Sequence, residues 1–138
     1  MEDTVTSLLA IESIGPGNAE KLRNAGVGSV EALLSTAATP ASRKQLAEEA
    51  GVSEHLVLEW ANRADLHRIK GVGEEYSDLL EVAGVDTVAE LARRNPENLY
   101  QKLMEVNSAT QRVRRLPTAA QVADWVQQAK DLPRALTY

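Results

Sequence analysis

The chain has no cysteine and no phenylalanine, and aromatic residues make up only 4% of its 138 positions. The absence of cysteine excludes disulfide bonds, zinc sites built from thiolates, and thiol nucleophiles. Leu, Val, Ile and Ala must therefore build the core, and these side chains favour packing between helices. The only imidazoles are His55 and His67, and neither has a catalytic partner or a second metal ligand nearby in the sequence. We therefore expect no enzymatic activity, no cofactor and no metal site.

Long hydrophobic runs and an excess of positive charge are also missing. No run approaches the ~20 apolar residues of a membrane span, and Glu2 and Asp3 stand where a signal peptide would carry basic residues. We therefore expect a cytoplasmic protein that does not contact a membrane. The net charge of -5 argues against a protein that coats nucleic acid through bulk charge, because such binding needs many phosphate contacts from Lys and Arg. A local basic surface is compatible with this charge.

The chain does contain an internal repeat. When the sequence is shifted by 58 residues, segment 8–33 aligns with segment 66–91 without a gap, and nine positions are identical. The identical pairs are Leu8 and Leu66, Ile11 and Ile69, Gly15 and Gly73, Leu22 and Leu80, Ala25 and Ala83, Gly26 and Gly84, Val27 and Val85, Val30 and Val88, and Leu33 and Leu91. Self-similarity at a fixed offset is typical of a duplicated structural unit. It predicts two tandem repeats, over 1–64 and 65–138, and the lack of a flexible linker predicts that they pack as one compact unit.

The punctuation between the apolar positions is typical of helices, and sustained strand alternation is missing. Residues that favour helix starts are Ser29, Thr39, Ser53, Thr87, Asn95 and Thr118, and residues that favour helix ends are Gly26, Gly51 and Gly84. We therefore predict an all-α fold in which the matched apolar positions of the two repeats are mostly buried. These positions are Leu8, Ile11, Ile14, Leu22, Val27, Val30 and Leu33 in the first repeat and Leu66, Ile69, Val72, Leu80, Val85, Val88 and Leu91 in the second. Trp60 and Trp125 stand at similar places in both repeats, which favours core anchors over platforms for stacking bases.

The sequence marks the start of one helix, the end of another and the structure of its last residues less directly. Asp65 or Leu66 is expected to begin a short helix in the second repeat. A later helix is expected to run from Pro96 to about Val106, and the last residues of the sequence are expected to be frayed.

Each repeat contains a short turn followed by a helix with a small residue and a leucine on its inner face. The turns are Ile69-Lys70-Gly71-Val72-Gly73, followed by Ser77 and Leu80, and Ile11-Glu12-Ser13-Ile14-Gly15-Pro16, followed by Ala19 and Leu22. This pattern resembles the helix-hairpin-helix motif, with Ser13 in place of the first glycine. Over nearly its full length the chain also resembles a bacterial family known only as domain of unknown function 4332, which is described as flap-endonuclease-like in its helix-hairpin-helix part.

The resemblance implies two tandem helix-hairpin-helix repeats, each followed by further helices, that grip the DNA backbone without reading sequence. Glycines let such a turn approach a ligand closely, and the following helix presents N–H groups and the positive end of its dipole to a phosphate. Contacts to phosphates carry no base information. The residues expected to contact DNA are Ser13, Ile14, Gly15, Pro16, Gly17, Asn18, Lys21, Gly71, Val72, Gly73, Arg112, Arg114 and Arg115.

The two turns differ in the charges that follow them. Glu74 and Glu75 follow the second turn, where their carboxylates compete with a phosphate for the helix dipole. Uncharged Pro16-Gly17-Asn18 follows the first turn, and Lys21 lies one helical turn further on. The first turn is therefore the better candidate for contacting DNA.

Two charged clusters have both a functional and a structural interpretation. Between Arg93 and Arg115 the sequence carries six basic and two acidic residues, a local net charge of +4 (6 − 2), which either assists DNA binding or forms an ordinary solvated surface. Glu74, Asp78 and Glu81 share a helical face that suits Mg²⁺ in principle, but the apolar opposite face favours a solvent-exposed role.

These observations predict a non-catalytic binding module and leave two partners open. One is DNA, bound weakly through its backbone without sequence preference. The alternative is another protein, bound by a scaffold that has lost DNA binding. Neither function involves a small-molecule cofactor.

Overall fold

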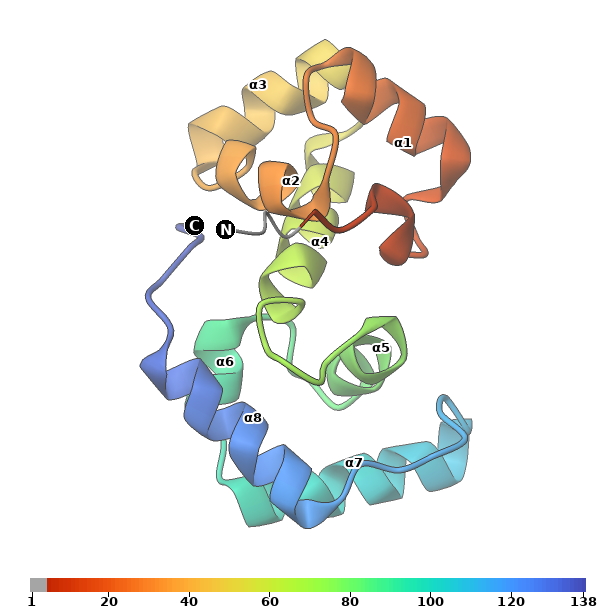
Figure 1. Cartoon of the computed structure of the whole chain (residues 1–138), viewed down its shortest axis with the longest axis vertical. Helices are drawn as coiled ribbons and strands as arrows, with labels where there is room; N and C mark the ends of the chain where they lie inside the picture. Colours follow the sequence, from red (N-terminus) through yellow and green to blue (C-terminus); the bar gives the residue numbers. More distant parts are fainter. Residues whose placement is uncertain (1–4) are drawn as a thin grey trace. The chain divides into compact units, whose positions relative to one another are not determined.

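A computed structural model describes residues 5–138, and every regular element among them is helical. The elements, shown in Figure 1, are the 3-10 helix η1 (Leu8–Ala10) and the α-helices α1 (Gly15–Asn24), α2 (Val30–Thr36), α3 (Pro40–Ala50), α4 (Glu54–Leu66), α5 (Glu74–Val82), α6 (Val88–Ala92), α7 (Pro96–Thr110) and α8 (Ala119–Asp131). The predicted all-α class is therefore confirmed for this part of the chain. No helix within it is long and apolar enough to cross a lipid bilayer.

The chain divides into two compact units, and each has a separate hydrophobic core. The first unit comprises the described residues up to Asp65 together with Ala135–Tyr138, and the second unit comprises Leu66–Arg134. The last four residues therefore belong to the first unit. The expectation that they are frayed is wrong, because the side chain of Leu136 is buried in the core of that unit.

Polar side chains at the helix starts set the boundaries in the first unit. The side chains of Ser29, Thr39 and Ser53 accept hydrogen bonds from the backbone N–H groups of Ala32, Ser42 and Leu56, respectively. The hydroxyl of Ser42 in turn accepts a bond from the N–H of Thr39, which completes a capping box. These bonds satisfy N–H groups that have no acceptor inside the helix.

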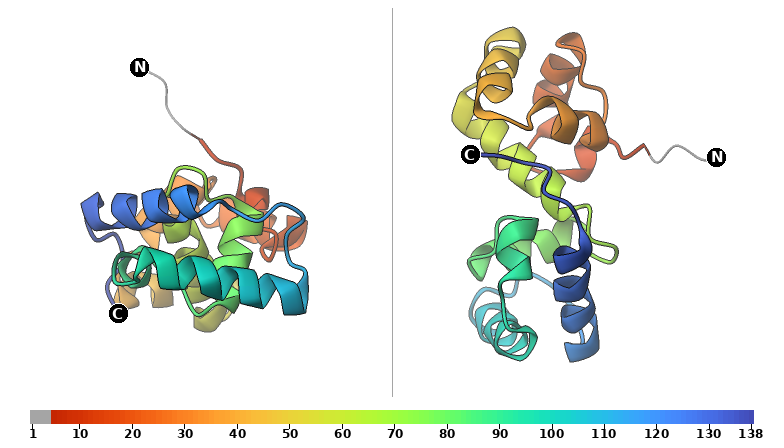
Figure 2. Two further views of the ribbon diagram at one scale, coloured as in Figure 1. Left: turned by 90° about the horizontal axis from the view of Figure 1, so that it is seen from below. Right: turned by 90° about the vertical axis from the view of Figure 1, so that its left-hand side faces the viewer.

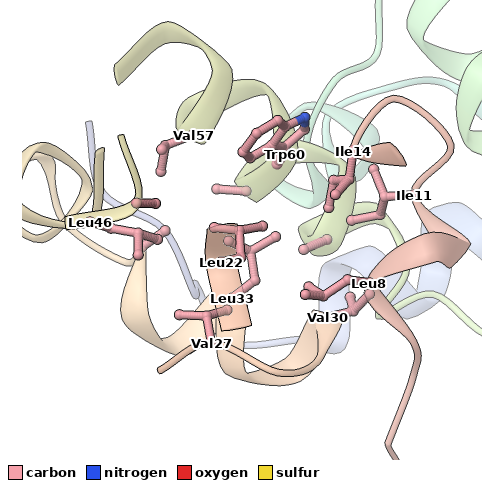
Figure 3. Close-up of a cluster of buried hydrophobic side chains, with 14 of the residues drawn as sticks. Leu8, Ile11, Ile14, Leu22, Val27, Val30, Leu33, Leu46, Val57 and Trp60 are labelled. Atoms are coloured by element: carbon pink, nitrogen blue, oxygen red, sulfur yellow. The ribbon is translucent and has the colours of Figure 1, made fainter. Parts of the chain in front are cut away.

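The core of the first unit is aliphatic, with one indole. Figure 3 shows the ring of Trp60, from α4, among the side chains of this cluster. The seven predicted core residues of the first repeat, each at most 3% exposed, are Leu8, Ile11, Ile14, Leu22, Val27, Val30 and Leu33. The core prediction is therefore confirmed here, and Trp60, at 0% exposure, is a core residue.

The second unit uses the same devices. The side chains of Thr87, Asn95 and Thr118 accept hydrogen bonds from the N–H groups of Glu90, Asn98 and Gln121, respectively. In this unit α8 packs against α6 and α7, and α5 packs against α7. The side-chain amide of Gln121 also bonds the N–H of Thr118, so α8 starts with a capping box.

The core of the second unit mirrors the predicted set. The seven predicted residues of the second repeat, each at most 4% exposed, are Leu66, Ile69, Val72, Leu80, Val85, Val88 and Leu91. Trp125 is 2% exposed and packs against Tyr76 with the ring centroids 5.2 Å apart. The predicted core and its tryptophan anchor are therefore confirmed in this unit as well.

Backbone hydrogen bonds recur at the offset that aligns the two segments. The matched N–H to C=O pairs are Ile14 to Ile11 (3.0 Å) and Val72 to Ile69 (3.1 Å), Val27 to Leu22 (2.8 Å) and Val85 to Leu80 (2.8 Å), and Leu33 to Ser29 (2.9 Å) and Leu91 to Thr87 (3.0 Å). Equivalent hydrogen bonds therefore stabilise the turn, the end of the helix that follows it and the start of the next helix in both units.

Two helix boundaries differ from the sequence prediction. No helix begins at Asp65 or Leu66, because α4 runs on to Leu66 from its start after Ser53, without a glycine or proline to interrupt it. For the same reason α7 extends past Val106 to Thr110 and ends only where Gln111 adopts a left-handed conformation with φ 50°. A continuing helix costs less than a break when nothing in the sequence favours one.

The inner face of α5 can be tested by truncating Leu80. Its side chain is 0% exposed, so Leu80→Ala removes buried methyl groups, leaves a cavity and is expected to lower the free energy of unfolding by about 2–5 kcal/mol. Urea unfolding monitored by circular dichroism measures this loss. Glu20→Ala, at an exposed position of α1, is the control and should have little effect. A wild-type urea midpoint for Leu80→Ala would show that the inner face of α5 is misassigned.

Candidate functional site

The first turn brings an exposed backbone to the start of α1. Ser13 is exposed, whereas the side chain of Ile14 is 2% exposed and belongs to the core, so Ile14 offers a ligand only its backbone. Gly15 adopts φ 69° and begins α1, and an added Cβ at this position would meet no atom within 4 Å. The chain therefore makes its left-handed step at a glycine that faces open space.

The place of the left-handed residue in the first turn explains why position 13 does not require a glycine. In the second turn the left-handed residue is Gly71, with φ 95°, which aligns with Ser13. In the first turn it is Gly15 instead, and among the described residues Gln111 is the only non-glycine residue with positive φ. Ser13 thus occupies an ordinary backbone region, and the two turns follow different local paths between equivalent hydrogen bonds.

The start of α1 has no side-chain cap. Ile14 precedes the helix and forms no side-chain cap hydrogen bond, and no acidic residue stands in the first turn. The N–H groups of Gly15 and Gly17 have no acceptor inside the helix, because helical bonding begins only at the fourth residue, and Pro16 has no N–H to satisfy. Lys21 lies four residues after Gly17 on the same helical face and is exposed. Uncapped N–H groups and one ammonium group thus share this end of α1.

Among the described α-helices, a missing side-chain cap is found only in the two helices that follow the turns. Within residues 5–138, α1 and α5 are the α-helices whose starts carry no side-chain cap bond. The capping residues of the other α-helices are Ser29, Thr39, Ser53, Thr87, Asn95 and Thr118. The two helices without a side-chain cap are therefore the ones that follow the two turns.

The second turn is held by packing. An added Cβ on Gly71 would lie 3.1 Å from Nε1 of Trp125, so the glycine packs directly against the indole. Val72 is 4% exposed and contributes its side chain to the core. Gly73 is exposed and precedes α5 with φ -96°. Of the three predicted contact residues in this turn, Gly71 and Val72 therefore have structural roles.

A histidine and a glutamate meet across the second turn. Nε2 of His67 lies 3.5 Å from Oε2 of Glu74, and their side chains are 12% and 24% exposed. Glu74 is the first residue of α5, where the helix dipole favours a negative charge. The chain thus places its own carboxylate at the helix end that a phosphate would use, and Glu75 adds a second, exposed one. Sequence spacing does not reveal the His67–Glu74 pair, because His67 and Glu74 lie on opposite sides of a turn, and neither helical nor strand periodicity continues through it.

The predicted basic residues are divided between the two units. Lys21 lies in the first unit, whereas Arg112, Arg114 and Arg115 precede α8 in the second unit. Nη1 of Arg112 lies 3.3 Å from Oδ2 of Asp78 on α5, and the carbonyl of Arg115 accepts a bond of 2.9 Å from the hydroxyl of Tyr76. This segment therefore packs on the helix that follows the second turn. Arg114 and Arg115 are exposed.

The remaining charged residues, which were considered as metal ligands or catalytic groups, make separate contacts. Asp78 pairs with Arg112, Glu74 contacts His67, and no group of three possible metal ligands forms among the described residues. His55 is exposed and lies 3.3 Å from Glu59 on the same face of α4.

One comparison with known proteins gives a match. The model of a family described as "Domain of unknown function (DUF4332)" matches residues 12–132, a range that includes the second turn, the first turn except Ile11, and α1 to α8. No curated protein matches the chain, and no solved structure matches it either. The description of the family assigns no activity.

The packing of the second turn predicts a contrast between its glycines. Gly71→Ala is expected to lower the free energy of unfolding by about 1–2 kcal/mol because of the left-handed backbone, and by more if Trp125 cannot move away from the new methyl group. Gly73→Ala is the matched control, since its φ is negative and an added Cβ meets nothing within 4 Å. Urea unfolding of both variants measures the difference. Equal stabilities would show that Gly71 is not held against the indole.

Proposed function

The chain belongs to the DUF4332 family of domains of unknown function, and we propose that it is a non-catalytic binding module that grips the phosphate backbone of DNA without reading sequence. The proposed contacts are those of a helix-hairpin-helix turn, made mainly by the first turn. The observation that supports this most directly is the uncapped, glycine-rich and acid-free start of α1.

An uncapped helix start is suited to an anion for two reasons. Its N–H groups have no internal acceptor, and the helix dipole places partial positive charge at the same end. A phosphate oxygen satisfies both, and Lys21 adds a full charge on the same face as Gly17. Because Gly15 and Gly17 have no side chains and open space around them, the backbone is accessible to a bulky sugar-phosphate chain.

The second turn makes a weaker contribution in this proposal. Glu74, close to His67, and the exposed Glu75 stand at the start of α5 and repel a phosphate. The exposed Arg114 and Arg115 lie in the segment that packs on α5 and offset part of this repulsion. One open turn and one turn filled by acidic residues imply weak, salt-sensitive binding, in keeping with the net charge of -5.

A charge reversal at Lys21 tests the proposed contact. Lys21→Glu is expected to weaken binding to duplexes of different sequence to the same extent, because phosphate contacts carry no base information. It should also lower the slope of log K against log salt by about 1, as expected for the loss of one phosphate contact. Fluorescence anisotropy at several salt concentrations measures both. Lys44→Glu, at an exposed position of α3, changes the net charge equally and should leave most of the affinity intact. If Lys21→Glu and Lys44→Glu lose the same amount of DNA affinity, the change in net charge explains the effect and Lys21 makes no specific contact.

Removing the acidic residues at the second turn should have the opposite effect. The double variant Glu74→Gln, Glu75→Gln keeps the side-chain shapes but frees the start of α5 for an anion, so DNA affinity is expected to rise. The control double variant Glu48→Gln, Glu105→Gln removes two exposed charges elsewhere and should raise affinity less. If neither wild type nor the Glu74→Gln, Glu75→Gln variant shows salt-sensitive DNA association, the turns are scaffolding and a protein partner replaces DNA in the proposal.

A further inference from the structure

A short segment at the end of the sequence occupies a defined site on the first unit. Helix α8 ends at Asp131, and Leu132 continues in an extended conformation with φ -81° and ψ 139°. Ala135–Tyr138, here called the tail, belongs to the first unit and ends beside α4 (Figure 2). The tail is therefore joined to one unit by the chain and packed on the other by contacts.

The contacts of the tail involve its backbone and its side chains. Leu136 is 3% exposed and joins the core of the first unit. The N–H of Thr137 donates to the carbonyl of Ala38 at 2.8 Å, and the hydroxyl of Tyr138 donates to Oδ1 of Asn62 at 2.8 Å. An apolar anchor, a backbone bond and a phenol bond thus hold three consecutive residues.

Arg43 is the centre of this site. Its side chain is buried, with 6% exposed, and donates from Nη1 to the carbonyl of Ala37 at 3.0 Å and from Nη2 to the carbonyl of Thr137 at 2.8 Å. The guanidinium carbon also lies 5.5 Å from the ring centroid of Tyr138. A buried guanidinium is costly unless hydrogen bonds satisfy it, and the tail supplies one of these acceptors and the aromatic face. The site of Ala37, Ala38, Arg43 and Asn62, here called the tail site, is therefore built around a bound peptide.

The connection to the tail is short and not helical. Pro133 follows Leu132, and its carbonyl accepts a bond of 2.6 Å from Nη2 of Arg68. Proline opposes continuation of α8 through this stretch. The described contacts of the tail come from three residues outside any helix, so release of the tail would break no backbone hydrogen bond within a helix, as in a local opening.

From these observations we propose that the tail site is a peptide-binding site that takes the tail of a second copy of this chain. Exchange of an identical segment keeps every contact of the tail and changes only the path of Leu132–Arg134, which makes it a low-cost route to a two-copy assembly. Within one chain the tail is held near its own site, so its effective concentration there favours the closed single copy at low protein concentration. Exchange between copies competes as the concentration rises.

A peptide titration tests the site. The probe is a labelled peptide with the sequence of residues 133–138, added to the full chain carrying Leu136→Ala and Tyr138→Ala, which weaken the resident tail. We expect this variant to bind the peptide at least about tenfold more tightly than wild type, because the wild-type tail occupies the site, with tenfold corresponding to ~1.4 kcal/mol. Adding Arg43→Met, which removes the donors without leaving a buried charge, should abolish binding. Circular dichroism establishes that each variant retains its helix content.

A mixing experiment tests exchange between copies. The Arg43→Met chain has an intact tail and a defective site, and the Leu136→Ala, Tyr138→Ala chain has the reverse. Analytical ultracentrifugation should show a 1:1 complex in the mixture and single copies in each separate sample, because only the mixture offers an intact tail to an intact site. The proposal is overturned if the folded variants form no complex when they are mixed. It is also overturned if the labelled peptide binds the Leu136→Ala, Tyr138→Ala chain equally well with and without Arg43→Met.

Discussion

The backbone N–H groups at the start of each helix impose the constraint on which much of this structure depends. The first turn of an α-helix contains donors that no residue of that helix can accept. In each α-helix of the described chain other than α1 and α5, a serine, threonine or asparagine side chain meets this need and sets the boundary. At α1 and α5 a glycine-containing turn stands in that place. Local chemistry that shapes the fold therefore also distinguishes these two helix starts from the others.

The two helix starts without a side-chain cap differ in the charged side chains next to them. At the start of α5, the carboxylate of Glu74 lies close to His67 and interacts favourably with the positive end of the helix dipole. This interaction stabilises the helix and disfavours the binding of an anion at the same place. At α1 no acidic residue stands in the first turn. The second turn also carries a structural load, because Gly71 packs against Trp125. The two turns thus have equivalent backbone hydrogen bonds, but their side chains have different roles.

The tail adds a constraint of another kind. Arg43 and Thr137 are 94 positions apart in the sequence and meet through a hydrogen bond from a buried guanidinium. A buried charge tolerates little geometric freedom, since loss of an acceptor leaves it unsatisfied. The tail presents an apolar anchor, a carbonyl and an aromatic ring in that order, from Leu136, Thr137 and Tyr138. A segment exchanged between copies would have to present the same groups in the same order.

Local sequence signals determined which residues start most of the helices and which apolar positions of segments 8–33 and 66–91 are buried. Ser29, Thr87 and Thr118 mark helix starts because a cap acts on residues two or three positions away, and the offset between repeats located both cores. The tertiary structure decided which glycine in each turn is left-handed, that His67 meets Glu74, and that Arg43 holds the tail. Each of these depends on neighbours brought together by packing, such as Trp125 beside Gly71. Periodicity and caps carry no information about such encounters, because their range ends within about one helical turn.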